Sequence, residues 1–302
     1  MIVINQGLGA LPRELAVDAA AAFGGVIYMS PDCSLALPNN VRLVSMPPHT
    51  TVSTLSRLLG WSFFTIKGTG CVLSDRTHSS ILLVSNPPIS PIIGLIARWF
   101  QNRRYALLVY DVYPEALERV GGLHSGSHLS RLWRKFNRLA VSHAEVVMTI
   151  SADMGKVVSQ YGVDRRGETV KIVPTWVDTQ WIRPIPKSSN DFARLHQQTD
   201  KLTVLYSGNI GRVHDLSMLP ALAQRLQVYP QIHFLVIGDG AGREALIDAC
   251  NRLALKNITF LTFQDEVLLP YSLATADVSI VALAEAGEGV SISQPLKCCN
   301  SL

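Results

Sequence analysis

The stretch Leu205-Tyr206-Ser207-Gly208-Asn209-Ile210-Gly211-Arg212 decides the fold of this 302-residue chain. Its apolar start predicts a buried strand, and Gly208 and Gly211 let the following turn approach a ligand with no Cβ in the way. A helical pattern starts at about Leu216, so its free N–H groups are expected to point at the turn, where Arg212 adds a cation. The segment predicts a phosphate site. The alternative is that the glycines serve a tight turn alone.

Two more segments repeat this pattern further along the chain. The run 234–240 reads as a strand that ends in a Gly-Asp-Gly turn, with a helical pattern from Arg243 to Leu253 behind it. The run 273–281 is followed by a Gly/Glu loop at 285–289. Three strands are therefore expected to end at one edge of a parallel sheet, where open α/β folds bind their ligands.

These ordered segments resemble the C-terminal nucleotide-sugar domain of GT-B glycosyltransferases, in particular the family-4 enzymes that build bacterial surface polysaccharides. The first half of the chain carries landmarks similar to those of the same family's acceptor domain, and they are Asn86-Pro87-Pro88, the run 107–115, the run 147–151 and the run 172–178. The resemblance covers residues from about 80 to 295. It implies an α/β fold of the GT-B type, with two Rossmann-like, doubly wound domains.

Alternation of strand-like and helix-like runs predicts where the domains lie. Strands are expected near 2–5, 25–29, 42–45, 81–85, 106–110, 146–150 and 171–173, and then near 203–206, 232–237, 258–261 and 278–283. We assign 1–185 to an acceptor-side N-terminal domain, 186–201 to a linker rich in polar residues, and 202–302 to a partial nucleotide-sugar-binding domain. Four strands fall short of the roughly six of such a domain. The chain is therefore expected to be C-terminally truncated and, at this length, to transfer little or no sugar.

Transfer of a sugar from a nucleoside diphosphate needs donors that neutralise the leaving diphosphate. The turn supplies a candidate set for this donor and phosphate site, consisting of Gly208, Asn209, Gly211, Arg212 and Gly238. The resemblance places the acidic loop beside the donor, with Glu285 and Ser291 in binding roles and Glu288 near the donor sugar in a catalytic role. Gln294 stands where the family's second acidic residue would be. The alternative for the two glutamates is an ordinary solvated loop.

Asp111 is the candidate catalytic residue of the first domain, because it ends an apolar strand three residues before Pro114. The resemblance implies a role at the acceptor site. The alternative is capping of the helix that follows, which Asp does well with a proline in the first turn. Ser151 is expected to cap a helix in the same way.

Composition is that of a folded protein, with 48% apolar residues and a net formal charge of +4. Its five cysteines include no C-x-x-C pair and no histidine at metal-ligand spacing, so neither a metal site nor a cofactor is expected. The N-terminus reads as a strand rather than a charged signal region, and prolines interrupt the apolar run 81–97. These features favour a cytoplasmic protein.

Charge is distributed unevenly, because no acidic residue lies between Glu118 and Glu145. Basic residues in this segment, on a helical pattern from Ser130 to Ser142, are candidates for contact with an anionic membrane surface, namely Arg131, Arg134, Lys135 and Arg138. The alternative is a solvated helix packed by its leucines. A nucleic-acid partner is not expected, because no recognition module is present.

The sequence thus predicts a retaining, metal-independent glycosyltransferase that moves a sugar from a nucleoside-diphosphate sugar to a surface-polysaccharide or lipid-linked acceptor, in the cytoplasm or at the inner face of the membrane. Retention and metal independence are implied by the resemblance. Two alternatives remain open: a non-catalytic nucleotide-binding remnant, and an enzyme similar to UDP-sugar 2-epimerases. A Rossmann dehydrogenase is disfavoured, because the run 7–12 lacks the third glycine of the dinucleotide motif.

Overall fold

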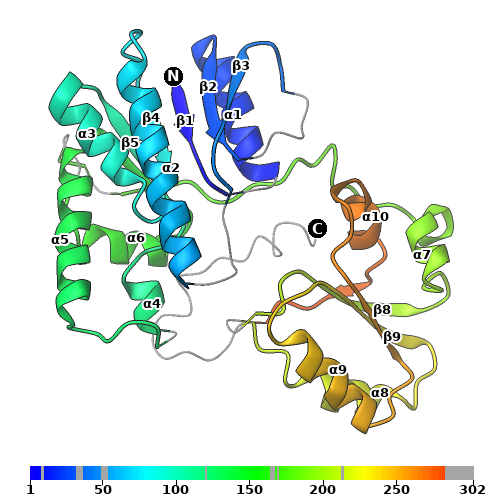
Figure 1. Cartoon of the computed structure of the whole chain (residues 1–302). Coiled ribbons are helices and arrows are strands. Elements are labelled where there is room, and N and C mark those ends of the chain that lie inside the picture. Colours follow the sequence, from blue (N-terminus) through cyan, green and yellow to red (C-terminus); the bar gives the residue numbers. More distant parts are fainter. Residues whose placement is uncertain are drawn as a thin grey trace. The chain divides into compact units, whose positions relative to one another are not determined.

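A computed structural model describes residues 1–7, 10–31, 37–48, 54–119, 121–163, 167–168, 170–211 and 214–282 of the chain. Contacts between residues divide it into two compact units, with the boundary between Pro174 and Thr175. Each unit has a parallel sheet of its own (Figure 1).

The first unit is built on a seven-stranded parallel sheet in the order β3-β2-β1-β4-β5-β6-β7. The strands are β1 (Ile2–Ile4), β2 (Val26–Ser30), β3 (Val41–Ser45), β4 (Ile81–Val84), β5 (Tyr105–Val109), β6 (Val146–Thr149) and β7 (Lys171–Ile172). The chain leaves β1 toward β2 and β3 and later returns on the other side at β4, which makes the sheet doubly wound as predicted. Each strand lies where the sequence places one.

Helices cover both faces of this sheet, which explains why β1 and β4 are continuous apolar runs. Helix α1 (Ala10–Phe23) packs on Val3, Leu82 and Leu108. Residues of opposite parity, such as Leu83, face a second core formed with α2 (Thr54–Ser74), α3 (Pro91–Gln101), α5 (His128–His143) and α6 (Ala152–Ser159). The short α4 (Glu115–Arg119) follows β5. Among the described helices, none is long and apolar enough to cross a bilayer.

Local sequence fixes the ends and the closest contacts of these helices. Ser151 accepts a hydrogen bond from the Met154 amide and caps α6, as predicted, and Ser127 does the same for α5. Helix α3 begins at Pro91, a favoured first helical residue. Gly94 lets α3 lie close to the sheet, because a Cβ atom there would come within 2.6 Å of the Leu83 side chain.

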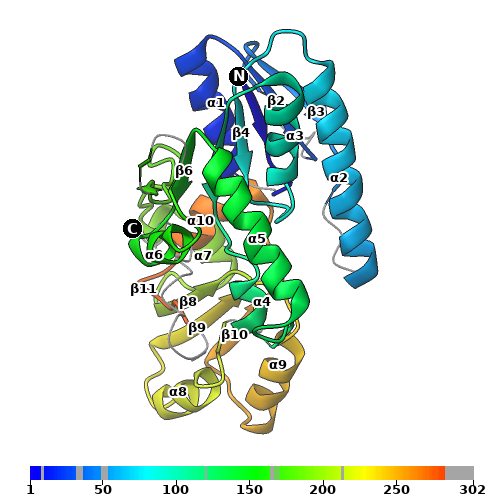
Figure 2. The same cartoon turned by 90° about the vertical axis from the view of Figure 1, so that its left-hand side faces the viewer.

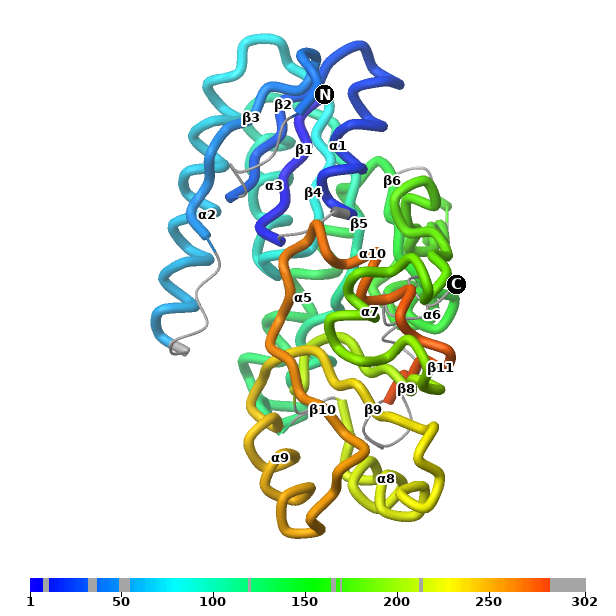
Figure 3. Tube along the Cα trace, turned by 90° about the vertical axis from the view of Figure 1, so that its right-hand side faces the viewer, coloured from blue at the N-terminus to red at the C-terminus, as the bar shows by residue number. Residues whose placement is uncertain are grey.

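The second unit has a four-stranded parallel sheet in the order β10-β9-β8-β11. Its strands, β8 (Leu202–Ser207), β9 (Ile232–Ile237), β10 (Ile258–Leu261) and β11 (Val278–Ser279), confirm the four that the sequence predicts. Helices α8 (Leu219–Leu226) and α9 (Arg243–Arg252) pack on one face through Leu219 and Leu246. Figure 3 traces this unit, with α7 (Asp191–Leu195) and α10 (Leu269–Leu273) on the other face.

The segment predicted as a linker contains the 3-10 turn η1 (Lys187–Ser189) and helix α7. Asn190 caps α7 by accepting from the Phe192 amide, and its side-chain amide donates to the Tyr271 carbonyl of α10 at 2.8 Å. Phe192 is buried in the core of the second unit. This segment therefore packs within the second unit, while the exact domain limits stay a prediction. A second 3-10 turn, η2 (Glu266–Leu268), precedes α10.

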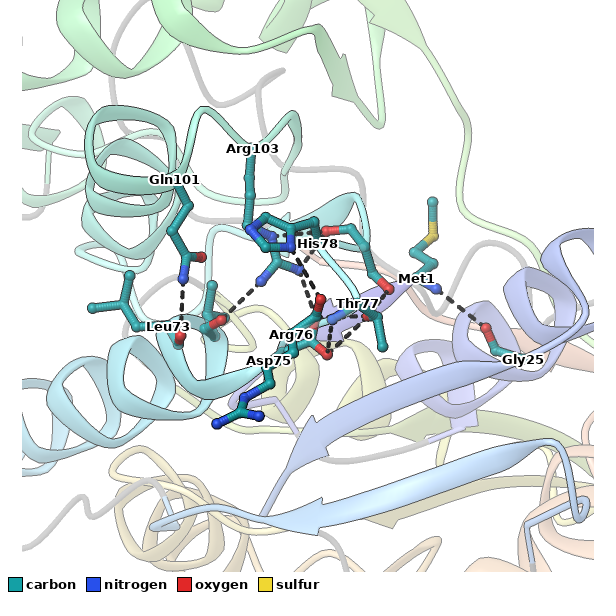
Figure 4. A network of polar contacts seen from close by, with 11 residues as sticks. Met1, Gly25, Leu73, Asp75, Arg76, Thr77, His78, Gln101 and Arg103 are labelled. Atoms are coloured by element: carbon teal, nitrogen blue, oxygen red, sulfur yellow. Dashed lines mark hydrogen bonds and ion pairs between the residues drawn. The ribbon is translucent and has the colours of Figure 1, made fainter.

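A buried arginine holds the edge of the first unit where α2 ends (Figure 4). The Arg103 side chain is 1% exposed and pairs with the Asp75 carboxylate at 3.0 Å. It also donates to the carbonyls of Val72 and Ser79. Burial acts to raise the pKa of Asp75, but hydrogen bonds from Thr77 and the charge of Arg103 outweigh it and lower that pKa.

We expect Arg103→Ala to lower the free energy of unfolding by about 3–5 kcal/mol, because it removes the buried partner of the Asp75 carboxylate and the guanidinium donors to two carbonyls. Chemical denaturation measures this loss. The neighbouring, exposed Arg104 is the matched control, and Arg104→Ala should change stability by less than about 0.5 kcal/mol. Since the Asp75 pKa is lowered in the folded protein, its contribution is present above the unfolded pKa and disappears as pH falls. The two variants should therefore become more alike in acid.

Candidate functional site

The Gly208–Gly211 turn follows β8 at the point where the strand order of the second sheet reverses. Strand β8 has β9 on one side and β11 on the other, and both pairings are parallel. All three strands therefore end at the same edge of the sheet. In open α/β folds the crevice outside such a reversal binds ligands.

Two glycine turns interlock at this edge. A Cβ atom on Gly238 would lie 1.9 Å from the Gly208 carbonyl oxygen, and one on Gly240 would lie 2.6 Å from the Ile210 carbonyl oxygen. Both residues also have φ in the left-handed region, +148° and +142°. Glycine is therefore required at both positions. The Gly-Asp-Gly turn packs directly against the turn after β8 and supports it.

Backbone hydrogen bonds show which amides remain for a ligand. The amides of Gly208, Ile210 and Gly238 donate to the carbonyls of Ile237, Asp239 and Leu261. The N–H groups of Gly208 and Gly238 are used inside the protein, while the predicted part of both residues in a phosphate site stays a prediction. The amides of Asn209 and Gly211 have no partner among the described residues. They are the donors that this turn can present to an anion.

A buried tyrosine fixes the shape of the turn from below. Tyr206, on β8, is fully buried, and its hydroxyl donates to the Asn209 carbonyl at 2.7 Å. Burial raises the pKa of Tyr206 to about 12, so the hydroxyl keeps its proton at neutral pH. Sequence analysis missed this role, because the tyrosine reads as one more apolar strand residue.

The helix after the turn begins later than predicted. Helix α8 starts at Leu219 rather than near Leu216, because Asp215 accepts from the Ser217 amide and forms a turn first. The ring nitrogen Nδ1 of His214 lies 3.2 Å from the Ala282 carbonyl oxygen. This contact brings the chain leaving β11 next to the glycine turn.

Four predicted donor-site residues lie outside the described residues, namely Arg212, Glu285, Glu288 and Ser291. Their roles stay predictions. The described neighbours bear on two of them, since Arg212 follows Gly211 directly and Glu285 comes three residues after Ala282.

Asp111 lies in the first unit, just beyond the end of β5. Its backbone amide is 3.3 Å from the Ser85 hydroxyl, while its side chain reaches solvent. Burial of the surroundings nevertheless raises the pKa of Asp111, because the charged form loses hydration in the hollow that it lines. Among the described residues, its carboxylate makes no capping bond to α4. The capping alternative therefore finds no support, and the carboxylate is left available.

Aromatic side chains surround this carboxylate. Tyr113 stacks on Trp133 with ring centroids 5.6 Å apart, and Trp61 of α2 meets Tyr113 edge-on at 6.4 Å. Burial raises the pKa of Tyr113 to about 12, the Asp111 charge adds to this effect, and Arg57 opposes it. A cavity of about 50 Å³ opens here, lined in part by Ser85, Asp111, Tyr113, Trp133 and Asn137. Faces of aromatic rings beside a carboxylate suit a ligand with apolar faces and hydroxyl groups.

A polar cluster at the ends of β1 and β4 went unrecognised in the sequence. This is the reversal point of the first sheet, equivalent to that between β8 and β11. The fully buried Gln6 donates its backbone amide to the Asn86 carbonyl at 2.8 Å, and its side-chain oxygen has no partner among the residues that the structure describes. An Asn-Gln-Gly run directly after a strand is the signal that could have found it. The unpaired oxygen is available to a ligand donor.

Of the four cations predicted to contact a membrane, one is already paired. The Arg134 guanidinium contacts Glu115 at 3.1 Å and Glu118 at 2.6 Å. Arg131, Lys135 and Arg138 are exposed on α5. The described residues contain no group of three His, Cys, Asp or Glu side chains placed to hold a metal ion.

Comparison with known proteins gives the same assignment to the second half of the chain. Residues 187–300 match the family described as "Glycosyl transferases group 1". The chain is 26% identical over 228 residues to "Probable glycosyltransferase WbjE" of Pseudomonas aeruginosa, covering 74% of this chain and 53% of that protein. It is 27% identical over 236 residues to "Putative colanic acid biosynthesis glycosyl transferase WcaI" of Escherichia coli K12, covering 76% and 57%. The chain thus spans about half the length of these curated relatives.

Solved structures of glycosyltransferases share the fold. Anabaena HepE, crystallised with UDP and glucose, superposes with a TM-score of 0.65 at 15% identity, covering 97% of this chain and 77% of that one. WaaG, a glycosyltransferase involved in lipopolysaccharide biosynthesis, gives the same values. The likeness confirms the predicted GT-B fold.

The interlocked turns lead to a stability prediction. Gly238→Ala should lower the free energy of unfolding by more than about 4 kcal/mol, because the new methyl group collides with the Gly208 carbonyl and φ is strained. Thermal denaturation followed by circular dichroism measures it. Gly70→Ala, on the exposed face of α2 with nothing within 4 Å of the added Cβ, is the control and should be neutral or stabilising. Equal stability of the two variants would contradict the interlock.

Proposed function

Because this chain belongs to the GT-B glycosyltransferases, we propose that it transfers a sugar from a nucleoside-diphosphate sugar to a surface-polysaccharide or lipid-linked acceptor, with retention of configuration. The geometry at the end of β8 carries this proposal. Two amides, of Asn209 and Gly211, have no partner in the part of the chain that the structure describes, and they lie against the Gly-Asp-Gly turn at the reversal of strand order. Such a nest of N–H groups suits a diphosphate.

The donor end of the reaction follows from this turn. As the glycosidic bond breaks, negative charge grows on the leaving diphosphate, and fixed N–H donors stabilise it without rearranging. Arg212 follows the last glycine and would add a full charge, while Glu288 would hold the donor sugar. A bound UDP in the related HepE crystals supports a uridine nucleotide as donor. The names of WaaG and of the E. coli relative support a surface glycan as product.

We assign the acceptor site to the cavity that Asp111 lines in the first unit. A carboxylate with a raised pKa, for which the described residues supply no hydrogen-bond donor, can accept the proton or the hydrogen bond of an acceptor hydroxyl. The faces of Tyr113 and Trp133 beside it would hold a sugar ring. We place the enzyme at the cytoplasmic surface of the membrane, and the exposed Arg131, Lys135 and Arg138 support this location. Arg134 is left out of that set, because its charge is balanced by two glutamates.

The reaction is tested by incubating the protein with UDP- and GDP-sugars and membrane-derived acceptors and analysing the products. For a protein of the full length of these relatives, we expect a new glycan together with free nucleoside diphosphate. Asp111→Asn should reduce transfer by roughly a hundredfold or more and leave donor binding unchanged. Since the raised pKa makes the ionised carboxylate costly to folding, this variant should be at least as stable as the wild type above the unfolded pKa.

Other products would decide against the proposal. Conversion of UDP-GlcNAc to its 2-epimer without transfer would identify an epimerase-like enzyme. Nucleotide binding with no product under any condition would indicate a non-catalytic protein.

The donor turn is tested separately with Tyr206→Phe, which removes one hydroxyl from beneath the Asn209 carbonyl. We expect the affinity for UDP to fall about fivefold, since loss of one net hydrogen bond of about 1 kcal/mol loosens the amides of the turn. Tyr105→Phe is a matched control, because Tyr105 is equally buried and its hydroxyl donates to the Ala140 carbonyl in the first unit. Calorimetric titration measures both. Equal weakening by the two substitutions would indicate a general loss of stability instead.

A further inference from the structure

The first part of α2 holds two buried N–H donors for which the described residues supply no acceptor. They are the Nε–H group of Arg57 and the Nε1–H group of Trp61. Residues four apart on a helix lie on one face, so the two donors lie one turn apart on the same side of α2. Figure 2 shows α2 on the face of the first sheet that α3 and α5 also cover. Because buried N–H groups are normally hydrogen-bonded, this pair calls for an acceptor from a ligand.

The charge of Arg57 is also left without a counterion. Its guanidinium carbon lies 5.7 Å from the centroid of the Trp61 ring, a cation–π contact that holds the group in place without neutralising it. Helix α2 contains no Asp or Glu, and none of the ion pairs among the described residues includes Arg57. A half-buried guanidinium that is fixed but unpaired is suited to bind an anion.

Tyr113 connects this pair with the cavity that Asp111 lines. Its ring meets Trp61 edge-on, with centroids 6.4 Å apart, and Tyr113 itself lines the cavity. Burial raises the pKa of Tyr113 to about 12, the Asp111 charge adds to this effect, and the Arg57 charge opposes it. Both charged groups therefore lie near the Tyr113 hydroxyl. The unpaired donors of α2 are thus neighbours of the proposed acceptor site.

We propose that Arg57 and Trp61 bind an oxyanion, a phosphate or a carboxylate, that is part of the sugar acceptor whose hydroxyl reaches Asp111. The inference rests on the proposed function and narrows it, because it makes the acceptor an anionic sugar rather than a neutral one. Phosphate and carboxylate share the chemistry that this site needs, namely a negative charge and several lone pairs. A guanidinium binds both through two parallel N–H bonds.

Two other occupants fit the pair less well. A neutral hydroxyl group would accept one N–H bond but would leave the Arg57 charge unbalanced. A metal ion or a cationic ligand would meet only donors and a positive charge, and like charges repel. A site built from donors also discriminates strongly, because a ligand without the anion leaves buried polar groups unpaired.

The experiment is titration of the full chain, without any nucleotide, with three soluble sugars followed by NMR of the indole N–H signals. The sugars are glucose 1-phosphate, glucuronate and methyl glucoside, which have similar rings but carry a phosphate, a carboxylate or no charge. We expect at least one of the two anions to bind at least about tenfold more tightly than methyl glucoside and to shift the Trp61 Nε1–H signal. The tighter of the two anions identifies the source of the charge.

The role of Arg57 is tested with a matched pair of variants on one helix. Arg57→Gln should weaken binding of the preferred anion at least about tenfold and leave methyl glucoside unaffected. Lys67→Gln is the control, because it changes the net charge equally on an exposed residue of α2, about 15 Å further along the helix axis. Arg57→Lys keeps the charge but loses the planar fork, so it should restore only part of the affinity.

The indole donor is tested with Trp61→Phe, which keeps an aromatic ring and removes the N–H group. We expect anion affinity to fall about fivefold, as for the loss of one hydrogen bond. The control is Trp99→Phe on α3, whose side chain is 57% exposed, and it should change nothing. Circular dichroism of each variant verifies folding.

Several outcomes would overturn the inference. These are equal binding of charged and neutral sugars, no binding of either anion, an unshifted Trp61 signal at saturation, and equal effects of test and control variants. Sugar transfer is measured separately, so anion binding through Arg57 without any transfer would count against the proposed function alone. Equal transfer to neutral and anionic acceptors would count against the anion site alone.

Discussion

The backbone of Gly238 lies so close to the Gly208 carbonyl that no side chain fits between them, and the site of the second unit depends on this contact. It places two turns from neighbouring strands on top of each other. The Gly-Asp-Gly turn after β9 forms hydrogen bonds within the protein, and it thereby fixes the position of the turn after β8. Only then do the Asn209 and Gly211 amides stand in fixed positions at the edge of the sheet. Preorganised donors of this kind stabilise charge without moving when it develops.

In the first unit, the proposed acceptor site is built around a side-chain carboxylate instead of backbone amides. Its candidate group is the Asp111 carboxylate, which has no hydrogen-bond donor among the described residues and can therefore bind a ligand. Burial raises the pKa of this carboxylate. Trp133 of α5 and Tyr113 line the cavity beside it, and the buried Trp61 of α2 contacts the Tyr113 ring.

Sequence alone predicted the strands of both sheets and the edge at which the site lies. The spacing of apolar residues, the positions of glycines and the order of strands along the chain can be read from the sequence. The turn after β8 and the strand ending at Asp111 could therefore be found from them. The features that the sequence did not reveal depend on contacts between residues far apart in the chain. The amides of Gly208 and Gly238 looked available until their bonds to Ile237 and Leu261 were seen. Arg134 reads as a free cation in the sequence, yet glutamates of another helix neutralise it.

The roles of Tyr206 and Gln6 were missed for the same reason. Each is a residue of a strand or strand end whose polar atom matters only because of its place in three dimensions. Residues 212 and 283–302 carry the remaining predicted donor contacts, and these stay predictions.

The central claim is that the Asn209 and Gly211 amides bind the donor diphosphate. The most direct measurement is amide NMR of the isotope-labelled protein titrated with UDP. The account predicts the largest shifts at Asn209 and Gly211, with smaller shifts at Gly208, Ile210 and Gly238, whose amides stay bonded within the protein. Unchanged signals of Asn209 and Gly211 in the presence of saturating UDP would contradict it.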